Sequence, residues 1–166
     1  SCRPPPSLPP SLRSSAPKWP PDVLRPADDG RQVCGLLAEV VAGSPPGVVV
    51  GMGVNVSQDR GVFPVETATS LRLVGVTVTR PQVVRAVLEQ LAELYETWDT
   101  YGWAAVKNSY ESVCVTLGRT VRVELPDGTA VLGTASSITD DGRLLVMTTS
   151  GPRAFAAGDV HHLRPV

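Results

Sequence analysis

The sequence predicts an α+β fold, in which a partial mixed or antiparallel sheet with helices is followed by a small five-stranded antiparallel β-barrel. Three observations lead to this class. Two apolar runs, residues 32–41 and 48–56, flank a turn rich in Gly and Pro at residues 43–47. Apolar side chains then recur at helical spacing from Thr79 onward. After Gly118 the apolar period falls from about 3.6 residues to about 2, which is the period of a β-strand.

The two apolar runs at the start are expected to pair as an antiparallel hairpin, because the turn between them is too short for a parallel crossover. Their sequences, QVCGLLAEVV and VVVGMGVNV, contain few polar residues. We therefore expect the hairpin to be buried on at least one face.

The helix that begins near Thr79 has a clear start signal. Thr79 is a candidate N-cap, Pro81 stands in the first turn and Gln82 completes a capping box. The side chains at helical spacing are Val83, Val84, Val87, Leu88, Leu91, Leu94, Tyr95 and Trp98. A second, shorter helix is expected over Trp103–Val113, with Gly102 at the junction.

The segment after Gly118 contains several short strands separated by Asp-Gly turns. We expect strands at residues 121–125, 130–138, 144–148, 154–157 and 160–163. This close spacing predicts a separate barrel domain over residues 116–166.

The first 17 residues are dominated by Pro and Ser. Proline fixes φ and has no backbone N–H, so this composition predicts a disordered arm. Two P-x-x-P matches leave open a ligand for a proline-binding domain. The chain is then expected to divide into an arm at 1–17, a first domain at 18–115 and the barrel at 116–166.

Composition and charge exclude several classes of protein. The net charge of -1 leaves no basic excess for phosphate neutralisation, so nucleic acid is not an expected partner. Apolar runs end well short of the roughly 18 residues that a membrane span needs, so a membrane protein is not expected. Three widely spaced cysteines fit a reducing cytoplasm better than a disulfide framework.

Glycines alternate along the second apolar run. Gly51 and Gly53 leave one face of the strand without side chains, and Gly35 on the partner strand extends this gap. Asn55 follows with an amide that can donate and accept hydrogen bonds. The pattern fits the approach of a flat ligand or of another backbone, and the sequence leaves both open.

A second constellation is the stiff segment Lys18-Trp-Pro-Pro-Asp22. Lys18 could steady a phosphate and Asp22 could hold Mg²⁺, although a solvated ion pair is the alternative. His161 and His162 are adjacent on an expected strand, so their side chains point to opposite faces and cannot serve one metal. Cys34, within an apolar run, is expected to be a core residue.

In order along the chain, these segments resemble the bacterial biotin protein ligases. The matching segments are KWPPDVL (18–24), GRQVCGLLAEV (30–40), VVVGMGVNV (48–56) and ATSL (68–71). LGRTVRVELPDG and AAGDVHHLR resemble the small C-terminal barrel of that family, which is of the Src-homology kind. The resemblance spans residues 18–166 and covers the C-terminal part of the catalytic domain plus the barrel.

The resemblance implies an ATP-dependent enzyme, a biotin–[acetyl-CoA-carboxylase] ligase of the cytoplasm. In such an enzyme biotin and ATP give biotinyl-5′-AMP with the help of Mg²⁺, and biotin is then transferred to a lysine. The implied partner is the biotin carboxyl carrier domain of an acetyl-CoA or acyl-CoA carboxylase, with a homodimer left open.

The family motifs also imply roles for individual residues. The catalytic positions are Lys18, Asp22 and Gln32. The biotin-binding positions are Gly35, Leu36, Gly51 and Gly53. The ATP-binding positions are Trp19, Pro20, Asn55 and Arg164, and the metal-side positions are Asp22 and Asn55.

The chain departs from the family pattern at three points. Pro21 replaces the Asn of the first motif, and Gln32 replaces the lysine of the second, which removes a cation. The family's G-R-G-R-x-G-R loop, which closes over the adenylate, does not occur in these residues. We therefore expect this chain alone to be inactive. The alternative function is a catalytically inactive module that binds a carrier protein or a ligase subunit.

Overall fold

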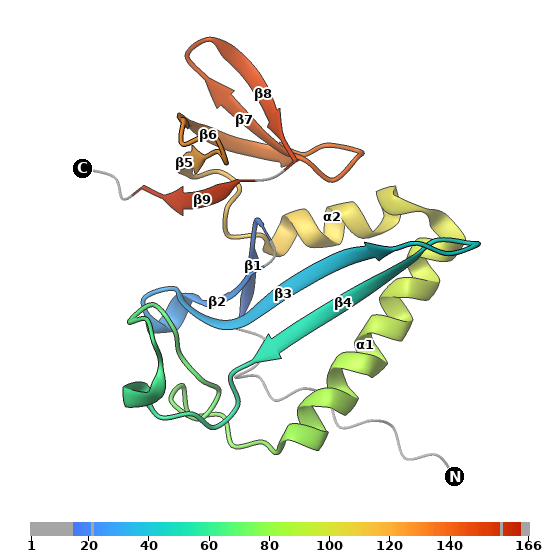
Figure 1. Cartoon of the computed structure of the whole chain (residues 1–166), viewed down its shortest axis with the longest axis vertical. Helices are drawn as coiled ribbons and strands as arrows, with labels where there is room; N and C mark the ends of the chain where they lie inside the picture. The colour runs from blue at the N-terminus through green and yellow to red at the C-terminus, as the bar shows by residue number, and fades with distance from the viewer. Residues whose placement is uncertain (1–14, 21, 157, 164–166) are drawn as a thin grey trace. The chain divides into compact units, whose positions relative to one another are not determined.

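The computed structural model describes residues 15–20, 22–156 and 158–163 of the chain (Figure 1). It contains two antiparallel sheets, of four and five strands, and two α-helices, which confirms the α+β class. The chain divides into two compact units. The first unit comprises Ser1–Ala16 and Asp22–Leu91, and the second comprises Pro17–Pro21 and Ala92–Val166. The domain boundaries expected at 17/18 and 115/116 stay predictions.

The four-stranded sheet has the order β1-β2-β3-β4. Its strands are β1 (Ala16–Lys18), β2 (Asp22–Arg25), β3 (Arg31–Val41) and β4 (Gly47–Val54), with short 3₁₀ turns at Pro26–Asp28 and Arg60–Val62. The expected arm lies outside the described residues up to residue 14. β1 begins at Ala16, so Ala16 and Pro17 belong to a strand although they fall in the stretch expected to be disordered. β1 is an edge strand, a position that tolerates proline.

The hairpin predicted from the two apolar runs is formed by β3 and β4, in antiparallel register from Cys34↔Val54 to Val41↔Gly47. Its base is buried, because Val33 and Cys34 pack with Leu71 and Val76 in the core of the first unit. The expectation of a buried face is wrong for the outer part of the hairpin. Val40 is 79% exposed, because nothing in the described part of the chain covers these strands.

The two helices are α1 (Arg80–Tyr101) and α2 (Trp103–Val113). The predicted capping box is present at the start of α1. The Thr79 N–H donates to Gln82 Oε1 at 2.8 Å, and the Gln82 N–H donates to Thr79 Oγ1 at 3.4 Å. Neither helix contains a buried residue, although the apolar spacing of α1 is that of a core helix.

The five strands of the second unit are β5 (Thr120–Glu124), β6 (Ala130–Ile138), β7 (Leu144–Thr148), β8 (Gly151–Phe155) and β9 (Asp159–His162). They form one antiparallel sheet of order β8-β7-β6-β5-β9. Side chains from all five strands meet in one core, so the sheet curls around its own interior as a small barrel does. No helix among the described residues is long and apolar enough to cross a membrane.

Candidate functional site

The candidate site in the first unit is shaped by a β-bulge in β3. Asp22 pairs with Gly35 and Val23 with Cys34, but Leu24 pairs with Gln32. Val33 is therefore an extra residue with no partner on β2. Because side chains alternate along a strand, this insertion lets Val33 and Cys34 both enter the core and moves Gln32 to the face that carries Asp22.

The bulge brings two predicted catalytic positions into direct contact. Gln32 Nε2 donates a hydrogen bond to Asp22 Oδ1 at 2.6 Å. A Cβ atom on Gly35 would lie 3.0 Å from Gln32 Nε2, so glycine at this position leaves room for the pair. The amide that replaces the family's lysine thus orients the carboxylate of Asp22 without adding a positive charge.

The three predicted glycines lie on the same face of the hairpin. Gly35 pairs with Gly53, and Leu37 pairs with Gly51. A Cβ atom on Gly51 or Gly53 would meet only a backbone oxygen, at 3.8 and 3.9 Å respectively, which is ordinary van der Waals contact. Close packing against the described part of the chain therefore does not require glycine at positions 51 and 53. This face lies beside Asp22, which pairs with Gly35.

The two other predicted site residues of the hairpin are Leu36, which lies on the opposite face from the glycines, and Asn55, which directly follows β4. Leu36 pairs with Met52 and packs against the core of the first unit, so it faces away from the three glycines. The Asn55 N–H donates to Val33 O at 2.9 Å, and Asn55 O accepts from the Leu71 N–H at 2.9 Å. Asn55 therefore continues the ladder of β4 beside the bulge.

The buried thiol next to the site is not a nucleophile candidate. Burial raises the pKa of Cys34, and the carboxylate of Asp22 raises it further. A thiol of this kind stays protonated and inert near neutral pH. The expectation that Cys34 is a core residue is confirmed.

The remaining segment of the first motif belongs to the second unit, which contains Pro17–Pro21. Trp19 is only 7% exposed and lies in the barrel core. Its backbone N–H donates to Thr116 Oγ1 at 2.9 Å, and its indole N–H donates to Gly142 O at 3.4 Å. The Val115 N–H donates to Pro17 O at 2.9 Å. The ring predicted to contact ATP is thus an anchor that holds Lys18 and Pro20 to the barrel.

Thr116, whose hydroxyl accepts the hydrogen bond from the Trp19 N–H, is fully buried and also contacts a histidine. His162 Nε2 lies 3.2 Å from Thr116 Oγ1. Burial lowers the pKa of His162 to about 4, and Arg119 and Lys18 add to this effect. His161 points elsewhere, with Nε2 3.7 Å from Glu124 Oε2, so the two histidines diverge as expected.

A protein-only metal centre is not present in the described residues, which contain no cluster of three or more His, Cys, Asp or Glu side chains able to hold an ion. Mg²⁺ in nucleotide sites commonly takes one or two carboxylates, with substrate phosphates and waters as the other ligands. Asp22 and Asn55 supply oxygen donors of this type, so their chemistry fits an ion that arrives with a nucleotide. Arg164, the remaining predicted ATP position, lies outside the described residues.

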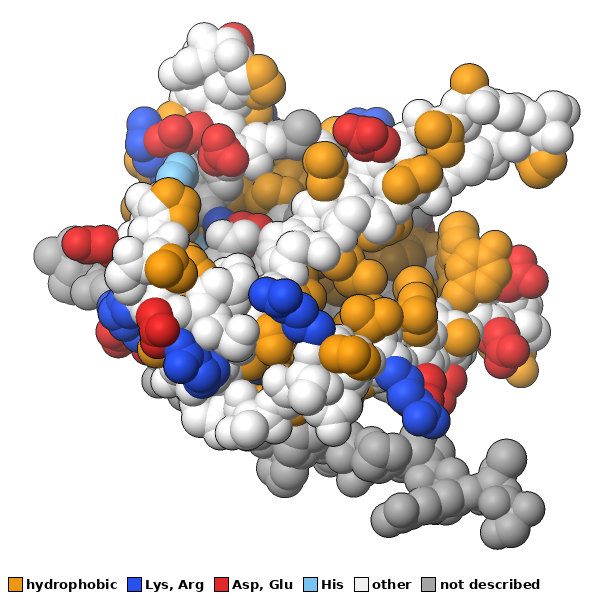
Figure 2. Space-filling view, turned by 60° about the horizontal axis from the view of Figure 1, so that its bottom comes forward, with side chains coloured by type: hydrophobic (Ala, Val, Ile, Leu, Met, Phe, Trp, Pro, Cys, Tyr) orange, Lys and Arg blue, Asp and Glu red, His pale blue; other side chains and the backbone are white. Residues whose placement is uncertain are grey.

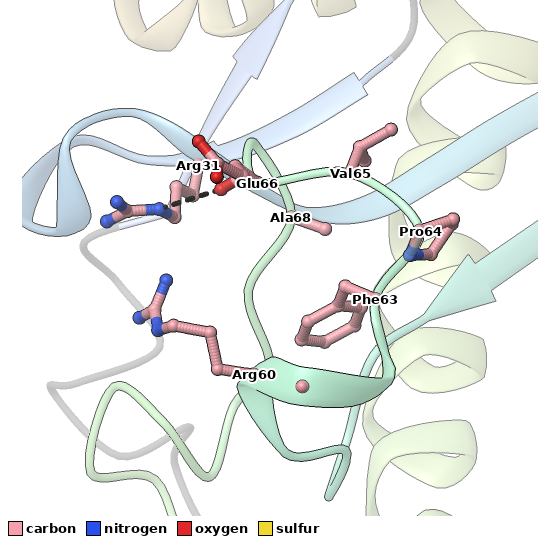
Figure 3. Close-up of a pocket in the computed structure, with 8 residues that line it drawn as sticks. Arg31, Arg60, Phe63, Pro64, Val65, Glu66 and Ala68 are labelled. Atoms are coloured by element: carbon pink, nitrogen blue, oxygen red, sulfur yellow. Dashed lines mark hydrogen bonds between the residues drawn. The ribbon is translucent and has the colours of Figure 1, made fainter.

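Sequence reasoning missed a pocket of about 350 Å³ in the first unit (Figure 3). Its lining residues are Arg31, Arg60, Gly61, Phe63, Pro64, Val65, Glu66 and Ala68. Arg31 Nε donates to Glu66 O at 3.0 Å. Hydrogen bonds also join the loop at residues 60–69 to Gln32 of the candidate site. The Gln32 N–H donates to Thr67 O, and Gln32 O accepts from the Thr69 N–H, both at 2.8 Å.

A carboxylate beside this pocket holds both arginines. Asp28 lies 3.0 Å from Arg31 Nη1 and 3.7 Å from Arg60 Nη2. The neighbouring hydroxyl of Thr69 lowers the pKa of Asp28, and the two arginines lower it further. In the sequence, only the family motifs that contain GRQ (30–32) and ATSL (68–71) adjoin this loop, and neither of them predicts a pocket.

Comparisons with known proteins agree on one family. Residues 116–163 match the family described as "Biotin protein ligase C terminal domain". The chain is 38% identical over 149 residues to the biotin–[acetyl-CoA-carboxylase] ligase of Mycobacterium tuberculosis, a match that covers 89% of this chain. The chain belongs to the biotin protein ligase family. It is also 32% identical over 149 residues, 86% of this chain, to the bifunctional ligase/repressor BirA of Bacillus subtilis.

Solved structures show the same fold. A crystal structure of the biotin protein ligase of Aquifex aeolicus matches with a TM-score of 0.73 and 23% identity, over 91% of this chain and 65% of that chain. The same enzyme in complex with biotin and ATP matches with a TM-score of 0.70 and 24% identity, over 91% of this chain and 62% of that one. The chain spans about half the length of the curated relatives it matches, 53% of the mycobacterial ligase and 45% of the Bacillus subtilis protein.

The role of Thr116 as an anchor can be tested by substitution. In Thr116→Val the buried N–H of Trp19 loses its acceptor, which costs about 1–3 kcal/mol for an unsatisfied donor. We expect faster hydrogen exchange at the Trp19 amide and a lower Tm of the second unit. Thr116→Ser keeps the hydroxyl and should preserve both values. Unchanged exchange at Trp19 in the valine variant would contradict the anchor.

The histidine next to Thr116 predicts a specific acid sensitivity. The pKa of His162 in the fold, about 4, lies below its unfolded value near 6.5, so the fold favours the neutral ring. Its contribution to stability is complete above the unfolded pKa and is lost as pH falls from about 6.5 towards about 4. Most carboxylates titrate at or below the end of this window.

We therefore expect thermal unfolding of the second unit to become easier across this window. His162→Gln should flatten the pH dependence there, whereas His161→Gln should leave it unchanged. An equally steep dependence in His162→Gln would show that other groups are responsible.

Proposed function

We propose that this chain supplies the biotin-facing hairpin and the C-terminal barrel of a biotin–[acetyl-CoA-carboxylase] ligase of the cytoplasm. The observation that carries this proposal is the glycine face beside the Asp22–Gln32 pair. The fused ureido and thiophane rings of biotin can lie against backbone where Gly51 and Gly53 carry no side chains. The family membership supports the same reaction.

The proposed reaction has two balanced steps. An oxygen of the biotin carboxylate attacks the α-phosphorus of ATP, the bond to the β-phosphate oxygen breaks, and pyrophosphate leaves with its electron pair. The amine of a lysine on a biotin carboxyl carrier domain then attacks the acyl carbon of biotinyl-5′-AMP. An amide forms, AMP leaves and the amine loses a proton to solvent.

The residues of this chain would act mainly by orientation and charge. Asp22, held by Gln32, would face the phosphates through Mg²⁺, which supplies charge neutralisation when it arrives with the nucleotide. Lys18, held to the barrel through Trp19, would neutralise a phosphate oxygen directly. Asn55, the other metal-side position, would offer an amide oxygen to the same ion.

A second candidate function is a module that binds a carrier protein or a ligase subunit without chemistry. The neutral Gln32 in place of a lysine favours it, because no cation then stands at that position. The exposed apolar residues of the hairpin and of α1 favour it as well. Binding of biotin to the glycine face favours the first function, and its absence favours the second.

Binding to the glycine face is tested by titration with biotin. We expect NMR chemical-shift changes at Gly35, Gly51 and Gly53, and we expect Gly53→Val to abolish them because two methyl groups would occupy the proposed ligand position. Gly61→Ala, outside the hairpin and with open space around its Cβ position, is the control and should titrate like the original chain. Shifts confined to the barrel would contradict a biotin site on the hairpin.

Catalysis is tested with purified chain, ATP, Mg²⁺, biotin and a carrier domain, read by the mass of the carrier. We expect no biotinylation above an enzyme-free control, because residues 1–166 lack the arginine- and glycine-rich loop and Gln32 is neutral. Loss of one preorganised donor alone typically costs roughly 10²–10³ in rate.

Two substitutions sharpen this test. Gln32→Lys and Pro21→Asn, made together, restore the family's residues in the first two motifs. We expect them to leave the chain inactive, since the loop is still lacking. Biotinylation by this double variant, or by the original chain, would show that the residues present are sufficient.

A further inference from the structure

The glycine face of the hairpin, the face that Gly35, Gly51 and Gly53 share, carries acidic side chains. Asp22 pairs directly with Gly35, so the two residues lie on the same face of the sheet. Glu39 lies four residues after Gly35 on β3, and side chains two or four positions apart on a strand share a face. Two carboxylates therefore border the surface on which a ligand would lie.

The arginines of these strands lie on the other face. Arg25 pairs with Arg31, one position beyond the pair of Leu24 with Gln32, so both arginines point away from the face of Asp22. The described strands β2, β3 and β4 contain no other Lys or Arg. Lys18, which the proposed function assigns to a phosphate oxygen, belongs to the second unit. In the absence of nucleotide and metal, the charge that these strands present to a ligand is negative.

The amide of Gln32 adds an acceptor to this surface. Gln32 Nε2 donates to Asp22 Oδ1 at 2.6 Å and to Cys34 O at 3.5 Å. A carboxylate only accepts hydrogen bonds, so Asp22 fixes which end of the amide faces it. Both N–H groups are then used within the chain, and no described residue donates to Gln32 Oε1. The hydrogen-bonding capacity that Gln32 keeps for a ligand is that of an acceptor.

The apolar surroundings do not depend on the polar end of a ligand. Leu37 pairs with Gly51 on the glycine face and is 63% exposed, and Val49 on the same face of β4 is 57% exposed. Hydrophobic side chains open to solvent are also visible in the space-filling view (Figure 2). Contacts of this kind are the same for any derivative that keeps the rings of biotin, so the polar end decides between such derivatives.

The two chemical forms of biotin differ at that end. Free biotin ends in a carboxylate, which is ionised at neutral pH and can only accept hydrogen bonds. Biotin attached to a lysine ends in a neutral amide, whose N–H is a donor. The first form meets the charge of Asp22 and the lone pairs of Gln32 unfavourably, whereas the second form can donate to Gln32 Oε1.

We propose that the glycine face recognises biotin in amide linkage, as it occurs on a biotinylated carrier domain, in preference to free biotin. The proposal rests on the proposed function, which puts biotin on this face with its carboxyl end towards Asp22, where the phosphates would lie. The ligand of this surface is then the product of the transfer step. Gln32, in place of the family's lysine, is the residue that sets this preference.

The experiment titrates the 166-residue chain with biotin and with biotin N-methylamide, without ATP or Mg²⁺. NMR chemical shifts of Gly35, Gly51 and Gly53 report binding and give Kd for each compound. We expect a Kd for the amide at least about fivefold lower, since two like charges about 4 Å apart cost roughly this factor even in bulk water.

Gln32→Lys is the deciding variant, because it puts an ammonium group beside Asp22 that can pair with a ligand carboxylate. We expect it to reverse the preference, so that biotin binds at least as tightly as the amide. Gln90→Lys makes the same exchange at an exposed position of α1 and should leave the ratio of the two Kd values within twofold of the original. The NMR spectra without ligand check that both variants stay folded.

A carrier domain extends the test to the full ligand. Calorimetry compares its biotinylated form with the same domain carrying an unmodified lysine. We expect the biotinylated form to bind at least about fivefold more tightly, and Gln32→Lys to reduce this difference. Equal binding of the two forms would show that the carrier surface, and not the biotinyl amide, is recognised.

The outcomes separate this inference from the proposed function. Binding of biotin as tight as that of the amide, or a ratio that Gln32→Lys leaves unchanged, would overturn the inference and leave the biotin site in place. Shifts of the three glycines with neither compound would contradict the biotin site itself, and the inference would fall with it.

Discussion

The candidate site depends on a single inserted residue. Strand alternation would place Gln32 and Cys34 on the same side of β3, and one of them would then be misplaced. The bulge at Val33 resolves this conflict, because it sends two consecutive apolar side chains into the core and turns the amide of Gln32 towards Asp22. Without the insertion, either the core would lose a residue or the pair would not form.

A second constraint holds the other half of the first motif. Trp19 anchors its segment in the barrel through two hydrogen bonds and a buried ring, and Thr116 receives one of those bonds at a fully buried hydroxyl. The conformation of the segment that carries Lys18 therefore depends on the barrel. The neutral state of His162 belongs to the same arrangement.

The distribution of apolar surface sets this chain apart from a self-sufficient domain. The barrel buries the apolar faces of all five of its strands, whereas the hairpin and α1 leave theirs open. The first unit has a small core at the base of the hairpin, and the outer strands gain little from it. We expect stability to be concentrated in the barrel and at the bulge.

The sequence alone was sufficient for the elements and for the family. Periods of 3.6 and 2 residues, a capping box and Asp-Gly turns are local signals, and they located α1, α2 and the barrel strands to within a few residues. The family motifs are contiguous in sequence, so the glycine face and Asp22 could be identified without coordinates. Burial of the hairpin was predicted wrongly, because periodicity reports which face is apolar and not whether anything covers it.

Only the tertiary structure decided which of these residues act together. A bulge shifts the pairing of two strands by one residue, and no local pattern in GRQVCG indicates that shift. The anchor joins Trp19 to a threonine 97 positions away, a contact set by packing rather than by sequence neighbours. Leu36, predicted beside biotin, faces the core for the same reason, since its side is fixed by pairing with Met52. The sequence therefore determined the elements and the kind of chemistry, while the pairing of strands determined the geometry.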